Sequence, residues 1–288
     1  MTKLDSFRLG ELYRELRIAR GLKMKDIVNG ELSQAQLSKF ENGQTMLSAD
    51  KLLIAISAIH MSLAEFEHAY HQYEDSSFFK QAKLIFQYHS SKNIEGLEEL
   101  LTIYADSSET YDIYNKLNSI VIHCAIHDLK PEHTISDSDK DFITTYLYSI
   151  EEWTEYELYI FGNTLQVLSN NDIIFLGKAF TERDSLYLSI LNNKYRTQLV
   201  LLNIIFVLLE RKQYYYADYF VKHLETILTY QDMFAKTVLI FLKKVLDYQE
   251  GRDTKLTDLE DYICNVRNLG HEDVAEFLQD NIDNLMKD

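Results

Sequence analysis

The chain has 288 residues, 46% of them hydrophobic, and a formal net charge of −16 at pH 7. This apolar content is enough for a real core in one large or two modest domains. The acidic total argues against nucleic-acid binding by the chain as a whole, because phosphate repels a negative surface. No apolar run has the roughly 18 residues of a membrane span, and we find no apolar core of a signal peptide. The two cysteines, Cys124 and Cys264, match no metal or redox spacing, so we expect a reduced, cytoplasmic protein.

Residues that break helices are scarce, with nine glycines and the single proline Pro131. Together with abundant Leu, Ile, Glu and Lys, this composition predicts an all-α protein. The charge is spread unevenly along the chain. Residues 1–66 hold nine Lys or Arg and eight Asp or Glu, whereas the remaining residues hold twenty against thirty-seven. We therefore expect a domain boundary near residue 66, between a near-neutral N-terminal domain and an acidic remainder with a net charge of −17.

Five short helices fit before residue 75. The first contains the stripe Leu9, Leu12 and Leu16, the second covers about residues 23–29, the third residues 34–41, the fourth follows Ser48 and the fifth opens at Ser62. The second and third are separated by a tight turn that contains Gly30. Two short helices around such a turn, the second of them polar, are typical of a helix-turn-helix.

The third helix lies in ELSQAQLSKFENGQT, residues 31–45. Ser33 and Gln36 form the S-x-x-Q version of a capping box, which satisfies free amides of the first turn. The following Asn-Gly pair tolerates a left-handed backbone and ends the helix. Leu37 and Phe40 are three residues apart and share one apolar face. The side chains that lie off this face are those of Gln34, Ala35, Ser38 and Lys39.

The stretch RELRIARGLKMKDIVNGELSQAQLSKFENGQ, residues 14–44, resembles the helix-turn-helix of phage-repressor-like (XRE) regulators. The Leu-Arg-x-x-Arg-Gly entry of that family matches residues 16–21, and its Glu-x-Gly exit matches residues 41–43. The form LSKFENG, followed later by MSLAEF at residues 61–66, is similar to the narrower Rgg/GadR/MutR family of Gram-positive bacteria. The stretch EEWTEYELYIFGNTL, residues 151–165, resembles the Rgg ligand domain, so the likeness extends over most of the chain.

The XRE resemblance implies that the outer face of the third helix meets DNA. The residues expected there are Gln34, Ala35, Gln36, Ser38 and Lys39. A glutamine in the first turn can pair with adenine, and Lys39 with Arg14 or Arg17 can bind phosphates. Two plainer readings stay open, namely that Gln36 is only a cap and that Gln34 is solvated surface. We expect Glu41 to be structural and to pair with Arg17 across the domain.

From about residue 78 the chain reads as one helix after another, joined by short polar loops. The expected helices cover residues 78–89, 93–105, 109–126, 140–150, 155–168, 172–186, 195–210, 214–228, 233–249, 256–266 and 272–286. Short connections force antiparallel neighbours, and the spacing of the pairs indicates a tetratricopeptide-like solenoid. We thus predict a five-helix phage-repressor-like domain at residues 1–66, a linker at residues 67–75, and an α-solenoid of antiparallel helix pairs for ligand binding and dimerisation at residues 76–288.

Asn203 lies inside the apolar run LVLLNIIFVLL, residues 199–209. A buried amide without partners is costly there, so Asn203 must be partnered internally or line a groove. Concave faces of helical solenoids bind extended peptides, and amide side chains can clamp a peptide backbone. The Rgg resemblance favours the groove and implies a short hydrophobic peptide as ligand. The further candidates for this site are Asn163, Arg196, Tyr230, Phe234 and Lys236.

The histidines His123 and His127 are spaced i, i+4, but the sequence offers no third metal ligand at hand, so we expect no metal and no cofactor. The absence of a phosphate loop, a nucleophile elbow or an HExxH motif predicts that the protein is not an enzyme. The sequence therefore predicts a cytoplasmic regulator that binds double-stranded promoter DNA as a homodimer, under control of a short hydrophobic peptide and with no membrane partner. The alternative is a helical-repeat interaction scaffold that binds no DNA.

Overall fold

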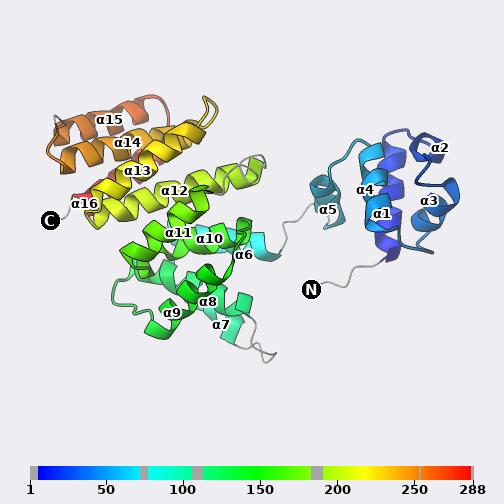
Figure 1. Cartoon of the computed structure of the whole chain (residues 1–288), viewed down its shortest axis with the longest axis horizontal. Helices are drawn as coiled ribbons and strands as arrows, with labels where there is room; N and C mark the ends of the chain where they lie inside the picture. The colour runs from blue at the N-terminus through cyan, green and yellow to red at the C-terminus, as the bar shows by residue number, and fades with distance from the viewer. Residues whose placement is uncertain (1–5, 72–76, 106–112, 183–190, 253, 287–288) are drawn as a thin grey trace. The chain divides into compact units, whose positions relative to one another are not determined.

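The computed structural model describes residues 6–71, 77–105, 113–182, 191–252 and 254–286. In these residues the protein contains only helices, which confirms the prediction of an all-α fold (Figure 1). The chain divides into two compact units, residues 1–87 and residues 88–288. The division falls within α6 (Ser77–Ser90), later in the chain than the predicted linker. Residues 72–75 of that linker lie outside the described residues.

The N-terminal unit contains the five short helices that the sequence predicts. They are α1 (Ser6–Ala19), α2 (Met24–Ile27), α3 (Gln34–Glu41), α4 (Ala49–Ala58) and α5 (Leu63–Tyr70). Capping boxes open α3 and α5, with Ser33 and Ser62 as the N-cap residues. These boxes are purely local, which is why the two helix starts can be read from the sequence.

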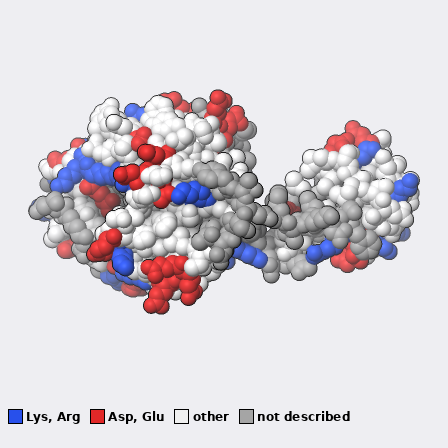
Figure 2. Space-filling model, turned by 90° about the horizontal axis from the view of Figure 1, so that it is seen from below, with Lys and Arg blue, Asp and Glu red and all other residues white. Residues whose placement is uncertain are grey.

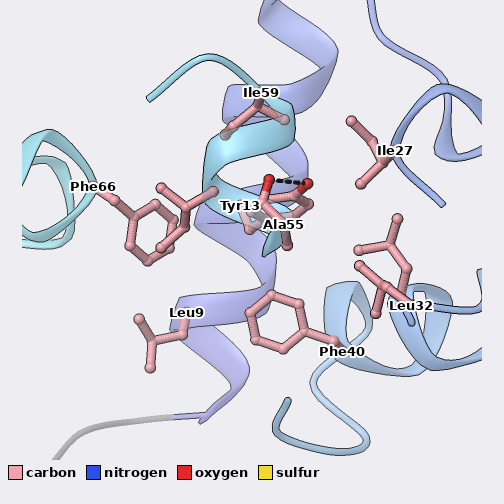
Figure 3. Packing of buried hydrophobic residues seen from close by; sticks show 10 residues of the cluster. Leu9, Tyr13, Ile27, Leu32, Phe40, Ala55, Ile59 and Phe66 are labelled. Atoms are coloured by element: carbon pink, nitrogen blue, oxygen red, sulfur yellow. Dashed lines mark hydrogen bonds between the residues drawn. The ribbon is translucent and has the colours of Figure 1, made fainter. Parts of the chain in front are cut away.

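Tyr13 of α1 lies at the centre of the core of this unit and is fully buried. Its ring packs against Phe40 of α3 and Phe66 of α5, with ring centroids 5.8 and 6.5 Å away. Its hydroxyl donates a 3.0 Å hydrogen bond to the backbone oxygen of Ala55 in α4 (Figure 3). Burial, followed by the charge of Glu41, raises the pKa of the Tyr13 hydroxyl, so the group remains a donor at neutral pH. One residue thus joins four helices.

The C-terminal unit is a succession of helices (Figure 1). They are α7 (Ile94–Ala105), α8 (Ile113–Leu129), α9 (Asp137–Ser149), α10 (Glu155–Thr164), the 3₁₀ turn η1 (Leu165–Val167), α11 (Asn170–Glu182), α12 (Leu191–Glu210), α13 (Tyr214–Ile227), α14 (Met233–Gln249), α15 (Leu256–Asn268) and α16 (Glu272–Leu285). The helix α8 packs on α7 and α10, α9 packs on α11, and the helices from α11 to α16 each pack on the next one. The helix α12 lies in the middle, because it contacts α10, α13, α14 and α16. The tetratricopeptide-like layout of these pairs stays a prediction.

Several boundaries differ from the predicted ones; α8, for example, ends at Leu129 and not at residue 126, and α12 begins at Leu191 and not at residue 195. The helix α9 begins at Asp137, three residues early, because Ser136 accepts a 3.1 Å hydrogen bond from the backbone N–H of Asp139. The helix α10 ends at Thr164, four residues before the predicted end, and continues as η1. The parts of predicted helices at residues 109–112 and 183–186 lie outside the described residues.

Charged side chains are interspersed with wide uncharged areas on the face seen in Figure 2. Within the described ranges, no single helix is long and apolar enough to cross a membrane. The bent pair α4 and α5, which turns by 94°, passes the length and composition criteria only when its two helices are taken together. Its apolar residues Ala55, Ile56 and Phe66 are buried in the core of the N-terminal unit.

Candidate functional sites

The helix α3 is held at both ends by its own sequence. The backbone N–H of Ser33 donates to the Gln36 side-chain oxygen at 3.1 Å, and the N–H of Gln36 donates back to the Ser33 hydroxyl at 3.3 Å. At the other end Gly43 adopts a φ of +67°. The N–H groups of Gly43 and Gln44 then bond to the carbonyls of Phe40 and Lys39 at 2.9 and 2.8 Å, which is a Schellman motif.

The inner face of α3 packs tightly on α1. Leu37 and Phe40 are fully buried. Gly10 of α1 lies so close that a Cβ atom added to it would be 1.8 Å from the backbone oxygen of Phe40. Only glycine fits at this crossing, and nothing in the local pattern around residue 10 distinguishes it from an ordinary helical glycine.

Arg17 and Glu41 form a buried ion pair between α1 and α3, as the sequence predicts for Glu41. The guanidinium group of Arg17 donates to both carboxylate oxygens of Glu41 at 2.6 and 2.7 Å and to the backbone oxygen of Leu22 at 2.6 Å. The hydrogen bond to Glu41 raises the pKa of Arg17. With 6% of its surface exposed, Arg17 cannot reach a phosphate, so it is removed from the candidate DNA contacts.

The outer face of α3 presents the remaining candidates to solvent. Gln34, Ala35 and Lys39 are exposed, and Ser38 is half-buried. Gln36 is half-buried and its side-chain oxygen is taken by the cap, which favours the structural role for that atom. Arg14 of α1 is exposed as well. An exposed amide in the first turn of a firmly capped helix can read a base edge without cost to the core.

Asn203 lies at the point where α12 crosses α10. Its side-chain amide donates a 3.2 Å hydrogen bond to the backbone oxygen of Gly162, although the residue as a whole is exposed. A Cβ atom added to Gly162 would lie 3.0 Å from the Val200 side chain, so the two helices pass closely here. Asn203 therefore has an internal partner, which is one of the two alternatives that the sequence left open, and its role in a groove stays a prediction.

Arg211, at the end of α12, was not among the predicted site residues. Its guanidinium group donates to the backbone oxygens of Leu165, Gln166 and Leu168 at 3.3, 2.9 and 2.7 Å, and to the side-chain oxygen of Asn170 at 3.1 Å. Burial lowers the pKa of Arg211. The backbone oxygen of Leu165 also accepts the N–H of Leu168 at 3.2 Å, whereas Gln166 and Leu168 follow the end of α10, so Arg211 adds to the capping of that break. The sequence feature that could have indicated this role is an arginine directly after an apolar helix.

Arg196 faces α10 about two helical turns before Asn203, on the same stripe of α12. It donates to the Glu155 carboxylate at 2.9 Å, and its guanidinium carbon lies 5.9 Å from the centroid of the Tyr159 ring. Asn163 is exposed, but its amide donates to the backbone oxygen of Tyr159 at 2.7 Å, one turn earlier in α10. Arg196 and Asn163 are thus held in place by α10 itself.

The start of α14 exposes an aromatic surface. Tyr230 and Phe234 have exposed fractions of 79% and 41%. The Phe234 ring lies 6.5 Å from that of Phe277 in α16, and Phe277 in turn lies 5.9 Å from Phe206 in α12. Lys236 is half-buried on the same helix. Three helices therefore contribute to one apolar area next to the stripe that contains Asn203.

The histidines of α8 are engaged with the connection to α9. The ring nitrogens His123 Nδ1 and His133 Nε2 are 2.8 Å apart, and His127 Nδ1 lies 2.8 Å from the backbone oxygen of His133. Burial, and then the charge of His133, lower the pKa of His123. Among the described residues, no three His, Cys, Asp or Glu side chains are placed to hold a metal ion.

The C-terminal unit matches a known protein family over most of its length. Residues 97–280 match the family model described as the C-terminal domain of the HTH-type transcriptional regulator Rgg. The chain belongs to the Rgg family. This confirms the family that the sequence motifs indicate, a family of transcription regulators.

Solved structures show the same fold as this Rgg family member over almost its full length. The SHP pheromone receptor Rgg2 of Streptococcus dysgalactiae is 21% identical, with a TM-score of 0.79 over 94% of this chain and 97% of its own. A protein of Listeria monocytogenes EGD-e is 19% identical, with a TM-score of 0.80 over 98% of both chains. The PrgX/cCF10 complex gives 13% identity and a TM-score of 0.68, over 96% of this chain and 99% of PrgX.

Proposed function

We propose that this chain is a cytoplasmic transcription regulator that binds promoter DNA through α3 as a homodimer. The observation that carries the proposal is the division of α3 into a buried face, Leu37 and Phe40, and an exposed face with Gln34 and Lys39. The Rgg family membership agrees with this reading. Gln34 and Ala35 contact bases, while Lys39 and Arg14 contact phosphates, and Ser38 with the free part of the Gln36 amide lies beside them.

The DNA test is a gel shift with promoter DNA at several salt concentrations. Gln34→Ala should weaken binding by about 1–3 kcal/mol and relax the preference for one base pair. Lys39→Ala should weaken binding to all sequences alike and reduce the salt slope by about one unit. Gln279→Ala and Lys83→Ala are matched controls, because both side chains are exposed and lie outside α3. A salt-independent shift, or equal effects of variants and controls, would refute phosphate and base contact by α3.

We further propose that the C-terminal unit binds a short hydrophobic peptide along α12. Arg196, Asn203 and Phe206 recur at seven and three residues, so they lie on one stripe of that helix. From Arg196 to Phe206 the stripe is roughly 15 Å long at 1.5 Å per residue. An extended peptide rises roughly 3.3 Å per residue, so four to five of its residues, roughly, span the stripe.

The chemistry of the stripe supports an apolar peptide. Its Phe206 end continues through Phe277 to Phe234, and these rings can bury hydrophobic side chains. Tyr230, four residues before Phe234 in the chain, is a further exposed aromatic candidate. The Asn203 amide keeps one N–H and its oxygen for a peptide backbone. The similarity to the SHP pheromone receptor Rgg2 and to PrgX, which binds cCF10, supports a small-ligand site in this unit. Asn163, Arg196 and Lys236 complete the proposed site.

Calorimetry with the low-molecular-weight peptide fraction of spent culture medium tests the site. Titration of the intact chain with this fraction should give a binding heat that saturates. Asn203→Ala should lower the affinity at least about tenfold, or about 1.4 kcal/mol. Thr226→Ala on α13 is the control, because its side chain is exposed and bonds only within its own helix. Unchanged affinity in a folded Asn203→Ala variant would remove the stripe from consideration. The scaffold alternative predicts neither this signal nor the DNA shift.

A further inference from the structure

An open groove of about 400 Å³ lies between α1 and α5 of the N-terminal unit. Its lining consists of Arg8, Glu11, Leu12, Glu15, Leu16, Ala19, Ala69 and Tyr70. The floor is apolar, whereas the three charged residues belong to α1 and are exposed. None of these three forms an ion pair with another described residue, although the guanidinium carbon of Arg8 lies 5.8 Å from the centroid of the Tyr70 ring.

One pair of charges along this groove, Arg8 and Glu15, is complementary to the same pair on a second copy, whereas Glu11 has no matching cation in the lining. Arg8 and Glu15 lie two helical turns apart, and Leu12 lies near the midpoint between them. If two copies of α1 meet in antiparallel orientation about a two-fold axis near Leu12, Arg8 of each copy faces Glu15 of the other. An isologous interface requires this kind of pattern, because each residue must contact its own complement on an identical surface.

The groove lies on the side of α1 away from α3. The residues of α1 that meet α3 are Gly10, Tyr13 and Arg17, as their contacts with Phe40 and Glu41 show. The helical period places positions 8, 12, 15 and 19 on the opposite side. A partner in the groove therefore leaves the outer face of α3 free.

We propose that this groove pairs the N-terminal units of two copies of the chain. Two copies joined in this way separate their α3 helices by three helix-to-helix steps of roughly 8–10 Å, or about 24–30 Å. That distance approaches the ~34 Å between successive major-groove half-sites on one face of DNA. The inference rests on the proposed homodimer and adds the surface through which the DNA-binding units meet. In the proposed homodimer the C-terminal units also join the chains, so even a weak contact between the N-terminal units suffices at the high effective concentration of tethered units.

Disulfide trapping tests the contact on the full chain without DNA. In a Cys264→Ser background, which removes the exposed native thiol, Leu12→Cys should give a covalent dimer under mild oxidation. Ile18→Cys in the same background is the matched control, because it lies on α1 and is 54% exposed but does not line the groove. It should remain uncrosslinked. If sedimentation shows a dimer but both variants crosslink equally, or neither crosslinks, the groove contact is refuted and the homodimer is not.

Charge reversal supplies a second readout, in which variants of the same Leu12→Cys chain are compared with one another. Arg8→Glu or Glu15→Arg in the Leu12→Cys chain should slow crosslinking about tenfold, a change of about 1.4 kcal/mol, because like charges then face each other. The double variant, in which both charges are exchanged, should recover the original rate. Failure of the double variant to recover would exclude the crossed pairing. A chain that sediments as a monomer would overturn the homodimer and this inference together.

Discussion

Arg211→Met is the most informative single perturbation of the C-terminal unit. The substitution keeps the length and apolar part of the side chain and removes the hydrogen bonds to three backbone oxygens and the Asn170 amide oxygen. A buried carbonyl left without a partner costs about 1–3 kcal/mol; Leu165 keeps its bond from the Leu168 N–H, so the carbonyls of Gln166 and Leu168 set an upper limit of about 6 kcal/mol. Arg211 is only half-buried, so water replaces part of the lost contacts. We expect a net destabilisation of about 2–4 kcal/mol.

For a unit of this size, 1 kcal/mol shifts the melting temperature by about 2–4 °C, so the expected decrease is about 4–16 °C. Differential scanning calorimetry of the full chain should show this decrease in the transition of the C-terminal unit, while that of the N-terminal unit stays in place. Arg211→Lys is the graded control, because an ammonium group keeps the charge but cannot reproduce the planar fork. It should recover part of the loss.

Hydrogen exchange locates the same effect. The amides of residues 163–170 should exchange faster in Arg211→Met, since Arg211 bonds the carbonyls of Leu165, Gln166 and Leu168 in this break. A melting temperature within 1 °C, roughly, of the wild-type value would refute the capping role. Equal destabilisation of both units would show that the effect is not local to the α10 break.

Two further predictions concern the N-terminal core and the α8–α9 connection. Gly10→Ala should destabilise the N-terminal unit by about 3 kcal/mol or more, because the new methyl group collides with the backbone of Phe40. DNA binding in a gel shift should be lost as well. Gly30→Ala is the control and should be neutral or slightly stabilising, because nothing lies within 4 Å of the added methyl group. Acidification should destabilise the C-terminal unit as pH falls below about 6.5, because the folded state lowers the pKa of His123 and the unfolded chain then binds the proton more readily. His133, Lys116 and Asp139 are the groups that act on it, and His123→Asn should flatten thermal melting curves over this pH range whereas the exposed His271→Asn should not.

Features set by near neighbours in sequence could be predicted. The starts of α3 and α10 coincide with their predicted first residues because the capping boxes at Ser33 and Thr154 involve only residues three positions apart. The same locality explains the Schellman end of α3 at the Asn-Gly pair. The Arg17–Glu41 pair spans 24 residues, and it was predicted only because the family resemblance placed both residues.

Features set by distant partners could not be predicted. The end of α10 depends on Asn203 and Arg211, which lie about 40 residues further along the chain and satisfy carbonyls that a longer helix would bond itself. A hydrophobic pattern does not record such partners, so the apolar periodicity up to residue 168 read as one helix. Gly10 is a similar case, since its role depends on how closely α1 crosses α3.

Asn203 shows how these limits apply to the candidate peptide site. The sequence posed two alternatives, an internal partner or a groove, on the premise that an amide in an apolar run must be either satisfied or accessible. An amide side chain, however, has two N–H donors and an oxygen with two lone pairs. One N–H is used on Gly162, where α10 ends, and the residue is otherwise exposed. Since the internal bond fixes the orientation of the amide plane, the free N–H and oxygen are held ready for a ligand at little further entropic cost. The structural role of Asn203 therefore strengthens the case for a binding role.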